Sequence, residues 1–237
     1  VWKWHSLLKQ NIDSIKNQTE QCLIIGICSN KSDYDFVKKN NIIAISTLNR
    51  PLGKKYQIGL EFSKIFYPKN VIIMGSDDIM TTNYVENINK YIDTYDIIGL
   101  NYWKIYDINK DKYYTLKYNH KIKQGYWGGK SSKYVNIYHT QEYGFNSEIC
   151  KTLPFTIGAG RSITFNALNK INWKLYLNEN KSLDTLSLFK LLIMNKCNYI
   201  TLETNDFYVI SLKDNNEDMI TSLDNIFKSN QLEISED

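Results

Sequence analysis

The feature that most constrains the fold is an alternation of apolar strands and amphipathic helices over the first hundred residues. Residues 22–28 form a continuous apolar run, which is typical of a strand buried on both faces of a sheet, and further runs follow at 42–45, 71–74 and 96–100. Segments with apolar residues at helical spacing alternate with these runs, at 4–15, 34–40, 54–66 and 84–92. Strand, helix and strand in repeated succession predict right-handed crossovers and a mostly parallel α/β sheet.

The pattern changes in the second part of the chain, from Asn101 onward. Residues 102–106 and 113–118 predict an antiparallel hairpin, and residues 120–150 have no clear periodicity. Further on we expect helices at 162–171, 183–194 and 219–227, strands at 199–202 and 207–212, and a frayed end over 229–237. This part therefore predicts a mixed, antiparallel addition to the parallel sheet.

Composition excludes several classes of protein. With 43% hydrophobic residues in 237, the chain has enough apolar material for one large domain or two small ones, and it is not disordered. No apolar run approaches the ~20 residues of a membrane helix. The net charge is only +4 and the basic residues are scattered, which argues against a nucleic-acid partner.

The cysteines and the first residue bear on where the protein works. The four cysteines form no C-x-x-C pair, and we interpret them as reduced, mostly buried thiols of a cytoplasmic protein: Cys22, Cys28, Cys150 and Cys197. The chain has no initiator methionine, and it begins Val1-Trp2 as if a strand had been cut. We therefore expect a domain excised from a longer polypeptide.

The first motif with chemical content is Gly75-Ser76-Asp77-Asp78, directly after a predicted buried strand and before a predicted helix. Ligands of open α/β sheets bind beyond the carboxyl ends of such strands. Two adjacent carboxylates repel each other, and a divalent cation with a bound diphosphate relieves the repulsion. The alternative is that one aspartate caps the helix and the other is solvated.

The second signal is the position of the arginines. The chain has only two, Arg50 in the loop with Pro51, Gly53 and Lys54, and Arg161 in the loop that begins at Gly158. A guanidinium group suits phosphate, as does the amino end of a helix. Both loops therefore predict phosphate or acceptor contacts, with two ordinary surface arginines as the alternative.

Taken in order, the motifs resemble a known family. They are a truncated first strand at 1–3, P-L-G-x-K at 51–55, G-S-D-D at 75–78, G-A-G-R at 158–161 and N-W-x-L-Y at 172–176. This set is similar to the GT-A superfamily of nucleotide-sugar glycosyltransferases, and to family-2-like enzymes in particular. The resemblance covers roughly residues 1–215.

The resemblance implies a GT-A (Rossmann-like) α/β fold, with a mostly parallel central sheet flanked by helices and a smaller mixed or antiparallel acceptor side. Residues 1–100 would form the nucleotide-sugar-binding half and residues 101–237 the acceptor-binding half of one domain. The implied reaction moves a hexosyl or deoxyhexosyl group from a nucleoside diphosphate sugar, with a UDP-sugar favoured, to a hydroxyl of a glycan or glycoside. The implied cofactor is Mn²⁺ or Mg²⁺, and the implied outcome is inversion.

The resemblance also implies roles for individual residues on the donor side. Asp78 would be the direct metal ligand, and Asp77 would face the sugar or ribose, although Ser76 replaces the first aspartate of the family's D-x-D motif. Asp33 would accept from the uracil ring or the ribose, or else it caps a helix. Lys213 would meet the diphosphate, or else it is a solvated lysine. The remaining residues implied in donor binding are Arg50, Lys54 and Arg161.

On the acceptor side, the resemblance implies a catalytic base at the amino end of a helix. Asp184 matches that position, and a carboxylate one hydrogen bond from an alcohol takes its proton as attack develops. The alternative is a plain first-turn aspartate, with Glu179 as the next candidate base. The three histidines have no metal-ligand spacing. Four residues of the irregular segment are weaker acceptor-site candidates: Tyr126, Trp127, Tyr138 and His139.

Two other functions remain open at this point. A nucleotidyltransferase also pairs acids on a Rossmann-like half, but it carries a Gly-rich basic loop after its first strand, where this chain has Trp4-His5-Ser6. A catalytically inactive module that binds a sugar or a nucleotide is the third hypothesis. Cation-dependent hydrolysis of a nucleotide sugar separates it from the enzyme.

Overall fold

The computed structural model describes residues 5–118, 158–176, 178, 180, 183–191, 195–213 and 232–236. The expected alternation is present at the start, where helix α1 (His5–Lys16) leads to strand β1 (Ile25–Cys28). Helix α2 (Lys31–Lys39) then crosses to strand β2 (Ile43–Ser46), which pairs with β1 in parallel. Apolar side chains from all these elements form one small core: Leu8, Ile12, Cys28, Val37 and Ile42. This first unit confirms the crossover predicted from the sequence.

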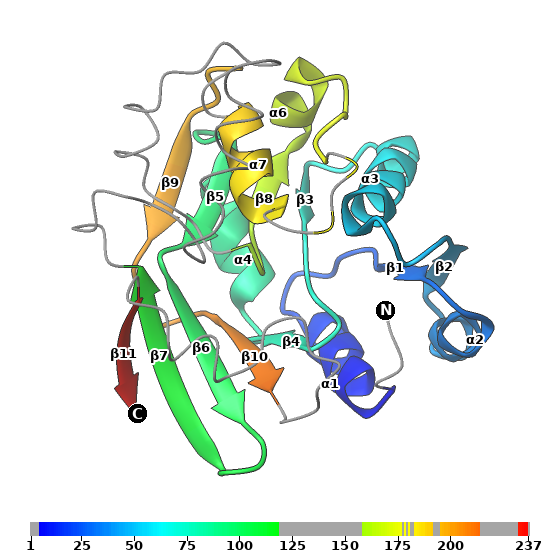
Figure 1. The fold of residues 1–237 in the computed structure, drawn as a ribbon. Coiled ribbons are helices and arrows are strands. Elements are labelled where there is room, and N and C mark those ends of the chain that lie inside the picture. Colours follow the sequence, from blue (N-terminus) through cyan, green and yellow to red (C-terminus); the bar gives the residue numbers. More distant parts are fainter. Residues whose placement is uncertain are drawn as a thin grey trace.

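The central sheet has four strands in the order β3-β8-β5-β9 (Figure 1). They are β3 (Asn70–Ile72), β8 (Ser162–Thr164), β5 (Ile97–Leu100) and β9 (Tyr199–Leu202). Strands β5 and β9 are parallel, whereas β8 runs antiparallel to both β3 and β5. The prediction of a mostly parallel sheet is therefore wrong, because an antiparallel strand from the second part of the chain lies between β3 and β5.

Strand β8 also corrects the predicted helix at 162–171. Residues 162–164 are buried in extended conformation between two strands, and helix α6 (Phe165–Lys170) begins only after them. The Thr164 hydroxyl accepts a hydrogen bond from the amide of Ala167, and a threonine in this position caps a helix start. The cap fixes the boundary three residues later than the apolar periodicity indicates.

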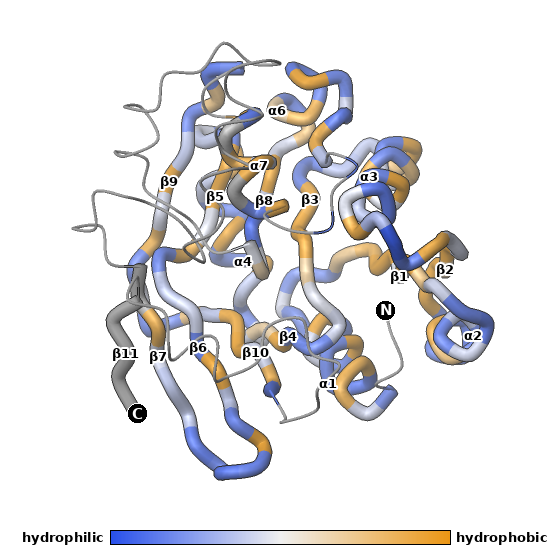
Figure 2. Tube along the Cα trace, viewed as in Figure 1, coloured by the Kyte–Doolittle hydropathy of each residue, from blue (hydrophilic) through white to orange (hydrophobic). Residues whose placement is uncertain are grey.

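Helices cover both faces of the central sheet. Successive side chains of β5 point to opposite faces, so neighbouring residues of this strand contact different helices. Ile97 packs with α6, with α7 (Leu183–Phe189) and with Leu60 of α3 (Leu52–Ser63). Ile98 packs on the other face with α4 (Tyr84–Asn89). Hydrophobic residues follow β3, β5 and β8 between these helices (Figure 2). The core is therefore a three-layer α/β arrangement.

A second, mixed sheet has the strand order β11-β7-β6-β10-β4. It contains β4 (Asp78–Met80), β6 (Tyr102–Asp107), β7 (Lys112–Tyr118), β10 (Val209–Lys213) and β11 (Leu232–Glu236). Strands β6 and β7 form the predicted antiparallel hairpin. Strand β10 is parallel to β6 and antiparallel to β4, so it joins the hairpin to the first part of the chain.

Strand β11 shows that the prediction of a frayed end over 229–237 is wrong for residues 232–236. It pairs with β7 from Leu232↔Tyr118 to Glu236↔Tyr114. Its sequence, Leu-Glu-Ile-Ser-Glu, alternates apolar and polar residues, as an edge strand does. The hairpin supplies the partner that this segment lacks when it is considered alone.

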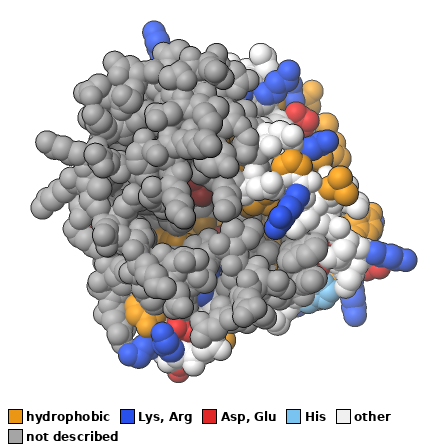
Figure 3. Space-filling view, in the orientation of Figure 1, with side chains coloured by type: hydrophobic (Ala, Val, Ile, Leu, Met, Phe, Trp, Pro, Cys, Tyr) orange, Lys and Arg blue, Asp and Glu red, His pale blue; other side chains and the backbone are white. Residues whose placement is uncertain are grey.

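The remaining predictions concern the surface, the cysteines and a helix outside the described residues. Among the described cysteines, Cys28 and Cys197 are buried and Cys22 is exposed, and all three are free thiols. On the face in Figure 3 the described lysines and arginines stand apart from one another, and hydrophobic side chains gather over α3. Within the described ranges no helix has the length and hydropathy needed to span a membrane. The helix predicted at 219–227 lies outside the described residues.

Candidate functional site

The loop that follows β3, residues 73–77, carries Asp77 and leads directly to Asp78. The Gly75 amide donates to Asp78 Oδ2 over 2.9 Å. A Cβ atom at Gly75 would lie 2.6 Å from Asp78 Oδ2 and 2.9 Å from Asp77 Oδ1, so only glycine lets the loop approach both carboxylates. Asp78 begins strand β4, which the sequence does not predict and which forms because the segment pairs with β10, and the predicted helix follows as α4.

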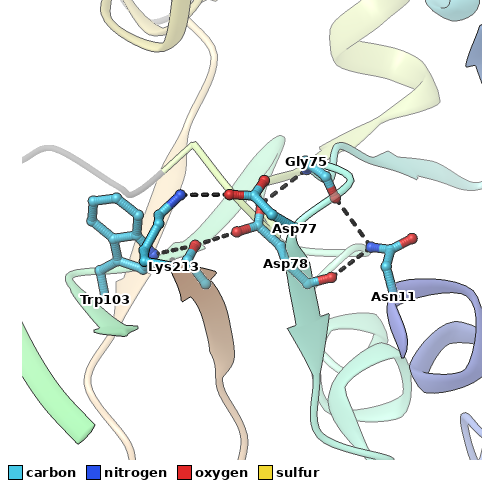
Figure 4. Close-up of polar contacts among 7 residues, drawn as sticks. Asn11, Gly75, Asp77, Asp78, Trp103 and Lys213 are labelled. Atoms are coloured by element: carbon cyan, nitrogen blue, oxygen red, sulfur yellow. Dashed lines mark hydrogen bonds and ion pairs between the residues drawn. The ribbon is translucent and has the colours of Figure 1, made fainter. Parts of the chain in front are cut away.

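Asp78 is held at each of its oxygen atoms (Figure 4). Its Oδ1 atom accepts a short hydrogen bond from the Ser211 hydroxyl, while Oδ2 accepts the Gly75 amide. Its main-chain carbonyl accepts from the Asn11 side chain of α1 over 2.5 Å, and the same amide group reaches the Gly75 carbonyl over 3.1 Å. Only 5% of Asp78 is exposed. The carboxylate is therefore fixed in position before any ligand binds.

The environment of Asp78 also changes its acidity. Burial raises the pKa of Asp78 to about 6, and the neighbouring charge of Asp77 acts in the same direction. The ammonium group of Lys213, the Ser211 hydroxyl and the Gly75 amide lower the pKa again, but by less. The acid pair thus carries more negative charge than its nearest partners neutralise.

Asp77 is the more accessible of the two acids. Its Oδ2 atom lies 2.5 Å from Lys213 Nζ at the end of β10, and 21% of its side chain is exposed. The Lys213 ammonium group also lies 5.6 Å from the centre of the Trp103 ring, a distance at which a cation is attracted to the ring face. The structure therefore brings Asp77, Asp78 and Lys213 together, as the sequence predicts.

The second predicted loop, residues 158–161, contacts the start of the loop that carries the acid pair. The Gly160 amide donates to the carbonyl of Ile73 over 2.8 Å, and the Ile73 amide donates to the carbonyl of Arg161 over 3.2 Å. The Tyr84 hydroxyl donates to the Gly160 carbonyl over 2.9 Å. These bonds hold the Gly158 loop against the end of β3.

Arg161 connects this loop to the helix that carries Asp184. Its Nη1 atom donates to the main-chain carbonyl of Asp184 over 2.9 Å and to the Ser187 hydroxyl over 3.1 Å, and only 3% of the residue is exposed. The carboxylate of Asp184 lies directly over Gly158, where a Cβ atom would overlap all three of its carboxyl atoms. Arg161 thus fixes the first turn of α7. The phosphate contact predicted for it stays a prediction.

The hydroxyl of Tyr56 on α3 is influenced by both acidic groups. Burial raises the pKa of the Tyr56 hydroxyl, and the charges of Asp184, Asp78 and Asp77 raise it further, in that order. Its ring also meets the Tyr176 ring edge to face, with 5.3 Å between the centroids.

Asp33 lies in the first turn of α2, and it is completely buried. Its Oδ1 atom is 3.0 Å from His5 Nε2, its Oδ2 atom accepts from the Asn30 side chain over 2.8 Å, and its amide donates back to Asn30 Oδ1 over 2.8 Å. The N-cap of α2 is therefore Asn30, not Asp33 as the alternative interpretation of the sequence has it, and Asp33 holds the Asn30 side chain in place. Contact of Asp33 with a base or ribose stays a prediction.

The basic residues around α3 differ in exposure. Arg50 and Lys54 are exposed before and within its first turn. Lys55 is only 4% exposed, and its Nζ atom lies 3.1 Å from Asn49 Oδ1. Burial lowers the pKa of Lys55. Sequence inspection singles out Lys54 and misses Lys55, whose position on the buried face of the helix is the signal that could have found it.

The two carboxylates of this site suit a hard divalent cation only when the phosphates of a bound substrate supply further oxygen ligands. Within the described ranges no three His, Cys, Asp or Glu side chains converge as a metal site. Two carboxylates are present, Asp77 and Asp78, and cations such as Mg²⁺ are commonly bound by one or two carboxylates plus the phosphates of a substrate. The residues therefore fit a cation that binds with a diphosphate.

Several candidates fall outside the described residues, namely Glu179, Tyr126, Trp127, Tyr138 and His139. Sequence inspection also misses three residues that the structure places around Asp78: Asn11, Trp103 and Ser211. They come from three distant segments, α1, β6 and β10, and no local motif connects them. Strand register places Ser211 and Trp103, and the packing of α1 against β4 places Asn11.

The described fold is similar to solved structures of S. aureus TarS, a glycosyltransferase. TarS 1–349 matches with a TM-score of 0.56 and 14% identity, over 90% of this chain and 58% of that one. TarS 1–349 in complex with UDP matches with a TM-score of 0.52 and 15% identity, over 87% and 56%. A further TarS structure matches with a TM-score of 0.54 and 14% identity, over 87% and 34%.

The chain thus spans 58% or less of each TarS chain that it matches. No protein-family model matches the sequence, and no curated protein is similar to it in sequence. At this level of identity the similarity shows the fold alone, an α/β fold with mixed sheets that is similar to that of the TarS structures.

Proposed function

We propose that this chain is a glycosyltransferase that uses a nucleoside diphosphate sugar, with a UDP-sugar as the favoured donor. The observation that carries the proposal is the acid pair, Asp77 and Asp78, placed at the carboxyl end of β3 with Lys213 beside it. Ligands of α/β sheets bind at such strand ends. The similar TarS structure that holds UDP supports the choice of donor.

On the donor side, Asp77 and Asp78 would hold Mn²⁺ or Mg²⁺, with Asp78 as the direct ligand fixed in advance by its hydrogen bonds. When bound, the cation stabilises the negative charge that develops on the departing diphosphate. Lys213 lies close enough to the acids to meet the same phosphates. We assign the donor nucleotide to the surrounding segments, namely the first turn of α2 with Asp33, the start of α3 with the exposed Arg50 and Lys54, and the loop with Arg161.

On the acceptor side, Asp184 would act as the general base. As the acceptor oxygen bonds to the anomeric carbon, the bond from that carbon to the diphosphate oxygen breaks, and the acceptor proton passes to the Asp184 carboxylate. A single displacement of this kind inverts the anomeric centre. Tyr56 and Tyr176 lie beside Asp184 and supply aromatic surface for an acceptor sugar.

The experiment that tests this function compares Asp184→Asn with Asp78→Asn in turnover of a UDP-sugar, measured as release of UDP. The Asp184 variant should bind UDP with Mn²⁺ as the parent does and lose turnover by about 10²- to 10⁴-fold, the usual contribution of general-base catalysis. The Asp78 variant should lose both binding and turnover, because the cation serves the ground state and the transition state alike. Asp35→Asn, an exposed aspartate on α2, is the matched control.

Two results would contradict the proposal in different ways. UDP binding by the parent without any turnover of UDP-sugars would leave a binding module. Turnover of Asp184→Asn at the parent rate would show that Asp184 only begins a helix, and Glu179 would be tested next.

A further inference from the structure

We propose that Trp103 and Ser211 are positioning residues for the acid pair: Trp103 orients the Ser211 hydroxyl, and Ser211 orients the carboxylate of Asp78. The inference rests on the proposed function, because it concerns how the chain prepares Asp78 for a cation and a diphosphate. Neither residue belongs to the motifs that suggest the fold family, and neither is assigned a contact with donor or acceptor.

The direction of the Ser211 hydroxyl follows from its two hydrogen-bond partners. The Trp103 indole N–H lies 2.7 Å from Ser211 Oγ, and an indole nitrogen is only ever a donor. Ser211 Oγ must therefore accept from Trp103, and its own hydrogen is directed to its other partner, Asp78 Oδ1. The indole thus removes the rotational freedom that an isolated serine hydroxyl has.

The order of these residues follows from the strands that carry them. Ser211 stands directly opposite Asp78 in the antiparallel register of β10 and β4. Trp103 comes from β6, the strand that pairs with β10 on its other side. Three adjacent strands therefore fix the order Trp103, Ser211 and Asp78, and each of the three residues is at most 9% exposed.

Trp103 contacts a partner of each of the two acids. Ser211 and Lys213 are two residues apart on one strand, so their side chains point to the same face. Trp103 donates its N–H to Ser211, the partner of Asp78, and its ring lies 5.6 Å from the ammonium group of Lys213, the partner of Asp77. One buried side chain thus organises the two groups that hold the acid pair.

The experiment measures the affinity for UDP in the presence of Mn²⁺ for Trp103→Phe, Ser211→Ala and Ser211→Thr. Replacing residues that orient a metal ligand typically costs about 10- to 100-fold in metal affinity or activity. We expect a loss of this size for Trp103→Phe and Ser211→Ala, whereas Ser211→Thr keeps the hydroxyl and should restore most of the affinity.

Matched controls separate positioning from a general loss of packing. The Trp173 indole donates to Asn169 Oδ1 over 2.8 Å, and the Ser162 hydroxyl accepts from the Asn70 side chain over 2.7 Å, both in buried positions away from the acid pair. Trp173→Phe and Ser162→Ala therefore remove the same chemical groups. Both controls should bind UDP with Mn²⁺ as the parent does. Parent-like affinity in Trp103→Phe and Ser211→Ala would overturn the proposal.

A double-mutant cycle tests the positioning even if the parent binds no UDP, a result that would refute the proposed function instead. Unfolding by denaturant is measured for Trp103→Phe, Asp78→Asn and the double variant. Because Trp103 acts on Asp78 through Ser211, the effects of the two substitutions on stability should be non-additive. Additive effects would contradict the orientation of Asp78 by Trp103.

Discussion

Gly158→Ala tests the placement of Asp184 without changing any charged residue. A Cβ atom at position 158 would overlap Cγ and both carboxylate oxygens of Asp184, and ordinary contact begins only at 3.4 Å. The carboxylate is the far end of an exposed side chain, so it can move away. A movement of about 1 Å restores contact, and a misplacement of this size can cost about 100-fold in rate.

We therefore expect Gly158→Ala to lower turnover of a UDP-sugar by about 100-fold, while UDP affinity stays at the parent value. Stability should change little, since an alanine at a compatible backbone position alters it by only about 0.4–1 kcal/mol. The assay is release of UDP under saturating donor, together with calorimetric binding of UDP and Mn²⁺. Parent-like turnover in Gly158→Ala would refute the assignment of Asp184 as the base.

Gly160→Ala is the control for this prediction, because it has the opposite expected effect. Gly160 has φ +77°, and a Cβ atom there would lie 2.5 Å from Tyr84 Oη and 2.7 Å from Val209 Cγ2, in the core. The left-handed conformation costs an alanine roughly 1 kcal/mol and overpacking adds about 1–3 kcal/mol. Gly160→Ala should therefore lower the free energy of unfolding, as measured by denaturant titration.

Three further substitutions test single contacts. Arg161→Met should lower the free energy of unfolding by about 1–3 kcal/mol, because it removes the buried hydrogen bonds to the Asp184 carbonyl and the Ser187 hydroxyl, and it should lower turnover. Reduced UDP affinity at parent stability would instead indicate a phosphate contact. Lys213→Met should raise the affinity for Mn²⁺ alone by about tenfold or more, because it removes the ammonium group that competes with the cation for Asp77. Calorimetry measures this affinity, and an affinity equal to that of the parent would contradict the competition. Asp33→Ala should destabilise the chain by about 1–3 kcal/mol in denaturant titration, since it removes the partner of His5 and Asn30, and parent-like stability would argue against the cap.

The elements that follow from local periodicity were predictable, and those that depend on distant partners were not. The apolar run at 22–28 predicts a strand, and the structure has β1 within it. The helical spacing at 54–66 predicts a helix, and the structure has α3 and the 3₁₀ turn η1 (Lys64–Phe66) in this segment. The three residues of β8 are too few to show a period, and their extended conformation comes from pairing with β3 and β5. Strand β11 likewise depends on the hairpin.

The candidate site shows the same division. Asp77 and Asp78 were predictable, because carboxylates that follow a buried strand lie where α/β sheets bind ligands, whereas Lys213 was suggested only by the resemblance to a family. Trp103 and Ser211 were not, because a buried tryptophan and a strand serine have no distinctive pattern until the register places them next to Asp78. A contact that depends on three strands cannot be recognised in any one of them.

The most direct test of the central claim is a calorimetric titration of UDP into the parent chain and into Asp78→Asn, each with and without Mn²⁺. The account predicts that the parent binds UDP more tightly when Mn²⁺ is present, and that Asp78→Asn loses this enhancement while it keeps a cooperative unfolding transition. Absence of UDP binding to the parent, or an unchanged enhancement by Mn²⁺ in Asp78→Asn, would contradict it.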